Sequence, residues 1–271
     1  MAIIAQLSDI HLAAGRDGRV DDGSGPVRAL RAAVSSLLSL PARPDAVVLT
    51  GDLADGGLSA EYARLRALLS PLPMPVYPMP GNHDDRDEMR KVFKRHAAAA
   101  GAGGAPRGPV QYAVDVAGVR LVCCDTTVEG HPHGHMSEER LAWLDRTLRS
   151  APDTPTVIAT HHPTFPIGIR FIDDMRFIDP AGFASVLSRH RQVVRVISGH
   201  VHRGSVGSLA GTVCTTCPST YRQLFLDLTQ PGRAAVTGEP AGFAIHLVEQ
   251  DGTATTHFVP TGNYRPLMDV E

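Results

Sequence analysis

Six short apolar runs alternate along this chain with segments of helical pattern, and this alternation limits the possible fold more than any other feature. Runs of this length between helices are typical of strands that are buried on both faces. The apolar runs lie at 2–7, 45–50, 75–79, 119–124, 155–160 and 193–198, and the helical segments at 26–40, 58–69, 85–96, 137–149 and 180–190. The sequence therefore predicts a layered α/β architecture with largely buried strands.

Two stretches depart from the alternation. Residues 97–109 are rich in alanine, glycine and proline, but they lack the spacing of a phosphate-binding glycine loop, so we expect a surface connection. After residue 204 the helical pattern stops, and short β-like runs follow at 212–217, 223–228, 241–249 and 254–259. We expect a β-rich tail that completes a sheet or forms a small subdomain.

Composition excludes several classes of protein. With 271 residues and 43% apolar content, the chain can bury the core of one large domain, or of one domain with a small appendage. A formal charge of −2 and a pI near 6.7 argue against binding to nucleic-acid polymers or acidic membranes. No apolar run approaches the roughly 20 residues of a membrane span. The opening MAIIAQLSDI has no basic segment and indicates a strand, not a signal peptide.

The four cysteines indicate a reducing compartment, so we expect a cytoplasmic protein. Cys123 and Cys124 are adjacent on an apolar run and are poor candidates for a disulfide. Cys214 and Cys217 form a C-x-x-C motif, for which zinc or redox chemistry is the alternative. The motif lacks a second ligand pair and a following helix, which favours buried structural thiols.

Side chains that can bind metal follow five of the apolar runs. These motifs are Asp9-Ile10-His11, Gly51-Asp52, Gly81-Asn82-His83-Asp84, His161-His162 and Gly199-His200-Val201-His202. The carboxyl ends of strands in an open α/β sheet face one crevice, so groups distant in sequence can converge there. In an extended chain, residues i and i+2 point to the same side, as Asp9 and His11 would.

The resulting ligand set is too large for one ion. It comprises Asp9, His11, Asp52, Asn82, His161, His200 and His202. Seven ligands with one shared carboxylate divide into two sites of four, which predicts a dinuclear centre. Nitrogen and oxygen donors without thiolate suit two divalent or trivalent ions of iron, manganese, zinc or cobalt, and the sequence does not select among these metals.

In this order the five motifs resemble those of the calcineurin-like metallophosphoesterase family, over roughly residues 1–205. The resemblance implies an α/β (α+β) fold: a four-layer αββα sandwich of two mixed β-sheets flanked by helices. Residues 1–205 would be the catalytic domain, and 206–271 a β-rich C-terminal segment that completes the sheet.

The resemblance also implies the role of each ligand. It places Asp9, His11 and His202 on the first metal, places Asn82, His161 and His200 on the second, and makes Asp52 the bridge. We expect His162 to support this centre without binding a metal.

Within the family, the motifs look most like those of bacterial class III cyclic nucleotide phosphodiesterases and related glycerophosphodiesterases. The stretch CPSTYRQLFLDLTQPG, 217–232, is similar to the tail of bacterial cyclic AMP phosphodiesterases. This similarity ranks 3′,5′-cyclic nucleotides such as cyclic AMP first among small phosphodiester substrates. Glycerophosphodiesters or a broad specificity come second. The similarity of the C-terminal segment to such phosphodiesterases also predicts a homo-oligomer.

We expect hydrolysis by attack of a metal-bound hydroxide. His83 is the candidate to protonate the leaving alkoxide or to stabilise the transition state, and Asp84 is the candidate to orient His83. A metal-binding scaffold without catalysis is the alternative, which the presence of every expected ligand disfavours. The histidine-rich stretch 131–135 is expected to be a solvated or rim segment, with substrate contact as the alternative.

Overall fold

The computed structural model describes residues 1–94, 108–229, 234–262 and 264. Residues 97–107 of the predicted connection at 97–109 lie outside the described part of the chain. So do residues 95 and 96, the last two of the predicted helical segment 85–96.

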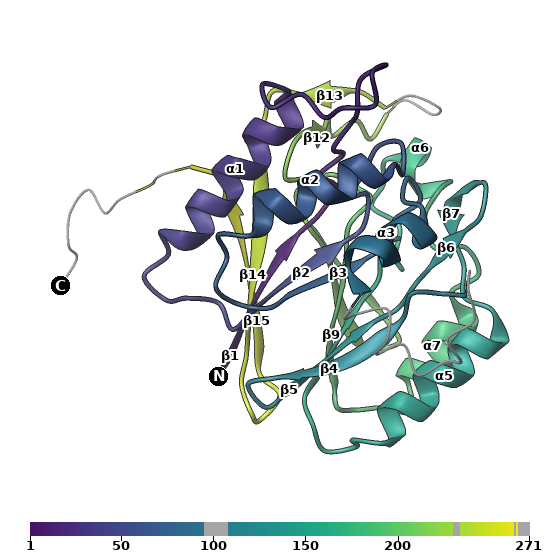
Figure 1. Cartoon of the computed structure of the whole chain (residues 1–271). Coiled ribbons are helices and arrows are strands. Elements are labelled where there is room, and N and C mark those ends of the chain that lie inside the picture. The colour runs from purple at the N-terminus through teal and green to yellow at the C-terminus, as the bar shows by residue number, and fades with distance from the viewer. Residues whose placement is uncertain (95–107, 230–233, 263, 265–271) are drawn as a thin grey trace.

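Two large β-sheets pack against each other through their inner faces (Figure 1). The first has the order β15-β14-β1-β2-β3. Its strands are β1 (Ala2–Leu7), β2 (Ala46–Thr50), β3 (Val76–Met79), β14 (Gly242–Val248) and β15 (Ala254–Pro260). Neighbouring strands among β1, β2 and β3 are parallel, whereas β14 is antiparallel to both β1 and β15.

The second sheet has the order β10-β11-β9-β8-β5-β4. Its strands are β4 (Tyr112–Val116), β5 (Val119–Cys123), β8 (Thr156–Ala159), β9 (Val193–Ser198), β10 (Ser205–Leu209) and β11 (Thr212–Thr216). Neighbours among β5, β8, β9 and β11 are parallel, and β4 and β10 are antiparallel edges. Two small hairpins pair β6 (Thr127–Val128) with β7 (His131–Gly134), and β12 (Gln223–Leu224) with β13 (Val236–Thr237).

Helices cover the outer face of each sheet (Figure 1). On the first sheet lie α1 (Gly25–Leu38), α2 (Ser59–Leu69) and α3 (Arg86–Val92); on the second lie α5 (Glu138–Arg149) and α7 (Ala181–Leu187); and α6 (Arg170–Asp173) is a short turn of helix in a connection. The six predicted strands and five predicted helices are therefore confirmed, with ends that differ by a few residues.

Neighbouring residues of one strand show the layers. In β5, Leu121 belongs to the core between the sheets, whereas Val122 packs in a separate core with Trp143 and Leu144 of α5. Alternate side chains of a strand point to opposite faces, so this strand is buried on both. The predicted four-layer αββα arrangement is confirmed.

Strands from the C-terminal part of the chain complete both sheets. β14 and β15 extend the first sheet beyond β1, and β10 and β11 extend the second beyond β9. The division into a catalytic domain and a C-terminal segment stays a prediction. All four cysteines are buried with free thiols, in agreement with a structural role. None of the helices in the described part of the chain is long and apolar enough to cross a membrane.

Candidate metal centre

The predicted ligands meet where the carboxyl ends of the two sheets come together. The loops after β1, β2 and β3 bring Asp9, His11, Asp52 and Asn82 from the first sheet, and the loops after β8 and β9 bring His161, His200 and His202 from the second. The predicted centre therefore lies between the two sheets, and the predicted ligands of each ion come from both sheets.

A first cluster consists of Asp9, His11, Asp52 and His202, whose candidate ligand atoms all lie within 4.8 Å of one another. His11 Nε2 is 3.1 Å from His202 Nε2 and 3.7 Å from Asp52 Oδ2. His202 Nε2 is 3.5 Å from Asp9 Oδ1. Two imidazole nitrogens and two carboxylates aimed at one point are a suitable donor set for a transition-metal ion.

A second cluster forms around His161 and His200, beside His162. His161 Nε2 lies 3.0 Å from Asn82 Oδ1 and 3.4 Å from Asp52 Oδ1. The two oxygens of Asp52 therefore face different clusters, since the other oxygen is the one near His11. This is the arrangement expected of a carboxylate shared by two ions.

The ring nitrogens of the histidines separate binding residues from supporting ones. His200 Nε2 is buried and has no hydrogen-bond partner among the residues that the structure describes, which a native fold rarely tolerates unless the atom has another function. His162 has both nitrogens engaged, Nδ1 at 2.8 Å from Thr126 Oγ1 and Nε2 at 3.1 Å from Pro132 O. The orphaned nitrogen of His200 fits a cation ligand, and His162 fits the supporting role predicted for it.

Hydrogen bonds at the far side of three of the candidate ligand rings, those of His11, His202 and His161, aim Nε2 at the centre. His11 Nδ1 lies 3.1 Å from Asp55 Oδ1, and His202 Nδ1 lies 2.9 Å from Arg222 O. His161 Nδ1 donates to the carbonyl oxygen of Thr50 at 2.8 Å. Such partners fix the tautomer and the orientation of a ligating imidazole. Asp55 was not predicted, although it follows Asp52 by three residues in the same loop.

The backbone at the centre is strained. Asp9, His11, Asp52, His200 and His202 all have φ between 49° and 68°, the left-handed region that non-glycine residues seldom occupy. Conformations of this kind cost about 1–3 kcal/mol each and concentrate at functional sites. The strain falls on five of the seven predicted ligands, which supports their selection for binding.

Opposing effects act on the acidic and basic groups of the centre. Burial by itself raises the pKa of Asp52, but the imidazoles of His161 and His11 hold it well below its ordinary value. Burial lowers the pKa of His161, but the Asp52 carboxylate raises it to about 9. Burial and the neighbouring His161 lower the pKa of His200 to about 3. Asp52 and His161 would therefore have to give up the proton that they share in order to hold a cation.

His83 lies at the rim of the centre. Its side chain is 42% exposed, and its ring meets the His11 ring edge-on with centroids 4.8 Å apart. His83 Nδ1 is 3.2 Å from the carbonyl oxygen of Asp55. The exposed position beside the first cluster is accessible to a substrate.

The prediction that Asp84 orients the histidine before it is wrong. Its carboxylate accepts hydrogen bonds from the backbone N–H groups of Leu53, Ala54 and Gly81, at 3.1, 3.0 and 2.8 Å, and from Tyr62 Oη at 3.0 Å. Burial and the Asp52 carboxylate raise the pKa of Asp84 to about 6. Asp84 therefore ties the loops after β2 and β3 together, and the acidic residue that faces His83 is Asp55.

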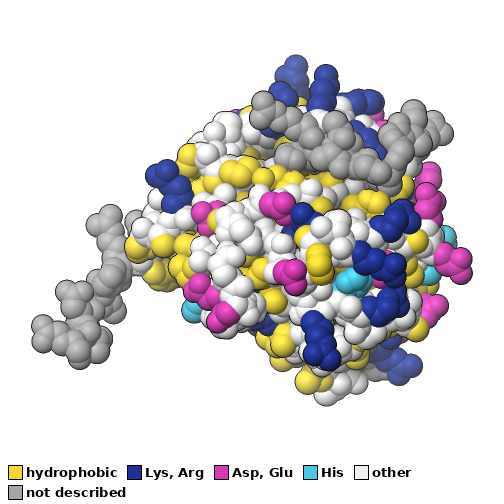
Figure 2. All heavy atoms as spheres, turned by 90° about the horizontal axis from the view of Figure 1, so that it is seen from below, with side chains coloured by type: hydrophobic (Ala, Val, Ile, Leu, Met, Phe, Trp, Pro, Cys, Tyr) yellow, Lys and Arg dark blue, Asp and Glu magenta, His cyan; other side chains and the backbone are white. Residues whose placement is uncertain are grey.

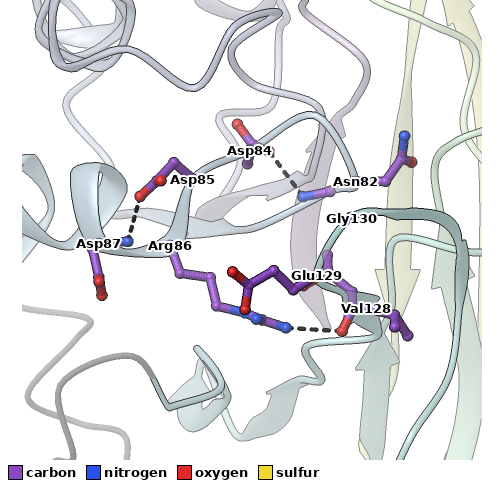
Figure 3. Close-up of a pocket in the computed structure, with 10 residues that line it drawn as sticks. Asn82, Asp84, Asp85, Arg86, Asp87, Val128, Glu129 and Gly130 are labelled. Atoms are coloured by element: carbon purple, nitrogen blue, oxygen red, sulfur yellow. Dashed lines mark hydrogen bonds between the residues drawn. The ribbon is translucent and has the colours of Figure 1, made fainter.

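A cavity of about 360 Å³ opens beside Asn82 (Figure 3). Asp85 and Asp87 lie on one side of it and Val128 and Glu129 on the other, and the side chain of Arg86 extends toward Val128 and Glu129. The Arg86 guanidinium forms an ion pair with the buried carboxylate of Asp125, at 2.7 Å from Nε to Oδ2, and donates from Nη2 to Thr127 O at 2.8 Å. This pair joins α3 to the loop after β5. Asp125 was missed, although it follows an apolar run as the predicted ligands do.

The histidine-rich stretch 131–135 forms β7 and the residue after it, outside both clusters. The rings of His131 and His133 lie 5.0 Å apart at the surface. The stretch touches the centre indirectly, since Pro132 O accepts the hydrogen bond from His162. Its position agrees with the rim segment predicted from the sequence.

The sequence profile of the calcineurin-like phosphoesterase family matches residues 3–204. The chain belongs to this family. A glycerophosphodiester phosphodiesterase of Enterobacter lignolyticus is 30% identical over 225 residues, which are 82% of this chain and 78% of that protein. A cAMP/cGMP dual specificity phosphodiesterase of Mycobacterium tuberculosis is 29% identical over 264 residues, 96% of this chain and 80% of that protein.

A solved structure of the same fold is that of a dimetal phosphatase from Danio rerio. It superposes with a TM-score of 0.66 at 18% identity, over 96% of this chain and 99% of that one. The likeness supports the four-layer sandwich of this calcineurin-like phosphoesterase.

Proposed function

We propose that this calcineurin-like phosphoesterase hydrolyses small phosphodiesters and that 3′,5′-cyclic nucleotides such as cyclic AMP are its preferred substrates. The observation that carries the proposal is the position of Asp52, whose two carboxylate oxygens face two separate clusters of ligand atoms. Two adjacent cation sites that share one carboxylate are suited to a phosphoryl centre, because both the attacking and the leaving oxygen need stabilisation.

The residues present fit two cations. Asp9, His11 and His202 would hold the first, and Asn82, His161 and His200 the second, with Asp52 shared between them. Bound there, divalent or trivalent ions of iron, manganese, zinc or cobalt supply neutralisation of the phosphate charge and activation of water. The donor set supports this range of metals.

His83 is proposed to act on the leaving group. Because its Nδ1 faces the carbonyl oxygen of Asp55, Nε2 is the nitrogen available to the substrate. With Nδ1 donating to that carbonyl oxygen, Nε2 has a proton to give only in the imidazolium form, and its transfer to the leaving alkoxide removes the charge that would otherwise develop there and leaves a neutral imidazole. A phenolate leaving group needs that proton much less, because it is already a weak base.

The cavity beside Asn82 has room for the organic part of a small diester. The relative from M. tuberculosis supports cyclic nucleotides, and the relative from E. lignolyticus supports glycerophosphodiesters as the second class. On the face of the molecule in Figure 2, acidic and basic side chains both occur, so that face has no single-sign charge of the kind that binds nucleic-acid polymers. Self-association through the C-terminal segment and a cytoplasmic location stay predictions.

The test is a side-by-side assay of metal-reconstituted protein on cyclic AMP, cyclic GMP, a glycerophosphodiester and a nitrophenyl phosphate monoester. We expect turnover of the diesters, fastest for a cyclic nucleotide, and loss of that turnover in Asp52→Asn. Tight binding of metal with no turnover of any phosphoester would overturn the proposal in favour of a metal-binding scaffold.

A further inference from the structure

Gln6 of β1 is buried between the two sheets, directly beneath the candidate metal centre. Its Nε2 donates to Thr50 Oγ1 at 2.8 Å and to the carbonyl oxygen of Ser198 at 3.0 Å. Thr50 is the last residue of β2 in the first sheet, and Ser198 is the last residue of β9 in the second. One amide group thus joins the carboxyl ends of both sheets.

The direction of these hydrogen bonds follows from the chemistry of the groups. The carbonyl oxygen of Ser198 can only accept, so the amide atom facing it is the nitrogen. Gln6 Oε1 then faces His246 Nε2 at 2.9 Å, which must donate, and His246 Nδ1 must accept from Thr256 Oγ1 at 2.9 Å. Burial lowers the pKa of His246 to about 3, so the ring is neutral with its proton on Nε2. The chain of bonds has one consistent polarity from β15 to the centre of the molecule.

Both imidazoles of the second cluster are tied to the two residues that Gln6 contacts, although His161 bonds to the carbonyl oxygen of Thr50 and Gln6 to its hydroxyl. The carbonyl oxygen of Thr50 is the acceptor for His161 Nδ1 at 2.8 Å. Ser198 is two residues before His200, and the intervening N–H of Gly199 donates to His161 O at 2.9 Å. A shift of β2 against β9 therefore moves His161 and His200 relative to the rest of the centre.

The imidazoles of the first cluster have separate supports. His11 is held by the side chain of Asp55, and His202 by the carbonyl oxygen of Arg222. Neither support is bonded to Gln6. The two imidazoles of the first cluster are therefore less dependent on the buried amide than those of the second, whereas the Asp9 carboxylate is joined to the second cluster by the backbone N–H of His200, at 3.0 and 3.1 Å.

At this end the two sheets are so close that a change in their spacing would displace the candidate ligands. A Cβ on Gly199 would lie 2.0 Å from Ser8 Oγ and 2.8 Å from Thr50 O, so only glycine fits between the loops. In a contact this tight, a change of a few tenths of an ångström in sheet spacing moves ligands from either side relative to the shared Asp52.

We propose that Gln6, held by His246, is a positioning residue that sets the spacing of the two sheets at the centre and thereby the affinity of the second site for its cation. The inference rests on the proposed metal centre and adds to it a residue that touches neither cation nor substrate.

The test measures metal binding directly. Metal-free protein is titrated with Mn²⁺ by calorimetry, and the wild type is expected to bind two ions. Gln6→Met keeps the length of the side chain but removes its hydrogen bonds. We expect it to weaken the second site by about 10- to 100-fold, as the loss of residues that orient metal ligands does elsewhere, while the first site changes by less than about threefold. The electron paramagnetic resonance signal of two coupled Mn²⁺ ions is expected to weaken accordingly.

Two variants keep the test independent of general destabilisation. Gln192→Met removes a glutamine at the amino end of β9, whose Nε2 donates to Leu148 O at 2.9 Å, and is expected to leave both affinities unchanged. His246→Phe is expected to weaken the second site as Gln6→Met does. The double variant Gln6→Met/His246→Phe should bind the second cation no more weakly than either single variant, since the two residues belong to one chain of hydrogen bonds.

A Gln6→Met protein that binds two ions with wild-type affinities would overturn the inference, and so would equal weakening of both sites. If Gln6→Met does not fold, His246→Phe decides the question by the same criteria. A wild-type protein that binds fewer than two ions would instead overturn the proposed function, and the inference with it.

Discussion

Replacement of Asp84 by asparagine tests whether this residue acts as a structural tie and not in catalysis. Oδ1 accepts from Ala54 N and Tyr62 Oη, and Oδ2 accepts from Leu53 N and Gly81 N. Asparagine replaces one oxygen by an NH2 group. With the NH2 in place of Oδ2, the N–H groups of Leu53 and Gly81 face another donor; with the NH2 in place of Oδ1, only the Ala54 N–H does, since the Tyr62 hydroxyl can turn to accept.

The magnitude follows from the number of bonds lost. The pKa of about 6 makes Asp84 ionised at pH 7.5, and hydrogen bonds to a charged group contribute about 1.5–3 kcal/mol each. One or two of them amount to about 1.5–6 kcal/mol, which is substantial beside the 5–15 kcal/mol that stabilises a typical protein. With about 2–4 °C per kcal/mol for a chain of this size, the unfolding temperature should fall by roughly 3–24 °C.

The assay is differential scanning calorimetry of metal-free protein at pH 7.5. Asp115→Asn is the matched control, because Asp115 is 60% exposed and its ion pair with Arg120 lies at the surface, where such pairs contribute about 0–1 kcal/mol. An Asp84→Asn protein that unfolds within about 2 °C of the wild type, or no earlier than the Asp115→Asn control, would refute the assignment of Asp84 as the tie between the loops.

Three further outcomes are expected. His83→Ala should slow hydrolysis of cyclic AMP by about 100- to 10,000-fold but affect a nitrophenyl diester much less, and equal losses would contradict the general-acid role. The pKa of His246 is about 3 in the folded protein and 6.5 in the unfolded chain, so between these pH values only the unfolded chain binds a proton at this residue. The free energy of unfolding should therefore fall by about 1.4 kcal/mol for each pH unit as the pH drops from 6.5 toward 3. Urea titrations of His246→Phe should lack this pH-dependent component. Glu129 lines the cavity, so its carboxylate should repel a diester whose alcohol part has an extra negative charge. Glu129→Gln should therefore raise kcat/KM for such a diester relative to kcat/KM for cyclic AMP. If this ratio of kcat/KM values does not change, the alcohol part does not lie in the cavity.

The strands, and the convergence of the candidate ligands, were predictable because both depend on local signals. A strand buried on both faces needs a continuous apolar run, and ligands at strand ends converge whatever the length of chain between them. The strand β4 lacks such a run: its sequence YAVDV contains a charged residue, and it pairs with β5 at the edge of the sheet.

The supporting contacts were not predictable, because they join residues that the sequence does not relate. Asp84 is next to His83 in the chain, yet its carboxylate bonds to three loop N–H groups and one hydroxyl. Gln6 and His246 are 240 positions apart and meet only because β14 pairs with β1. Adjacency in the sequence misled in the first case, and distance concealed the contact in the second.

The sharing of each cation site between the two sheets has a consequence for the order in which the newly made chain can mature. While the ribosome has delivered only the first strands, Asp9, His11, Asp52 and Asn82 are present, but no imidazole of the second sheet has been synthesised. The strand β1 can pair early with β2 on one edge, but its other edge stays unpaired until β14 is completed at Val248. On the proposed ligand assignment, metal uptake at full affinity would thus be a late step of biogenesis, and a chain truncated before His200 would lack ligands of both sites.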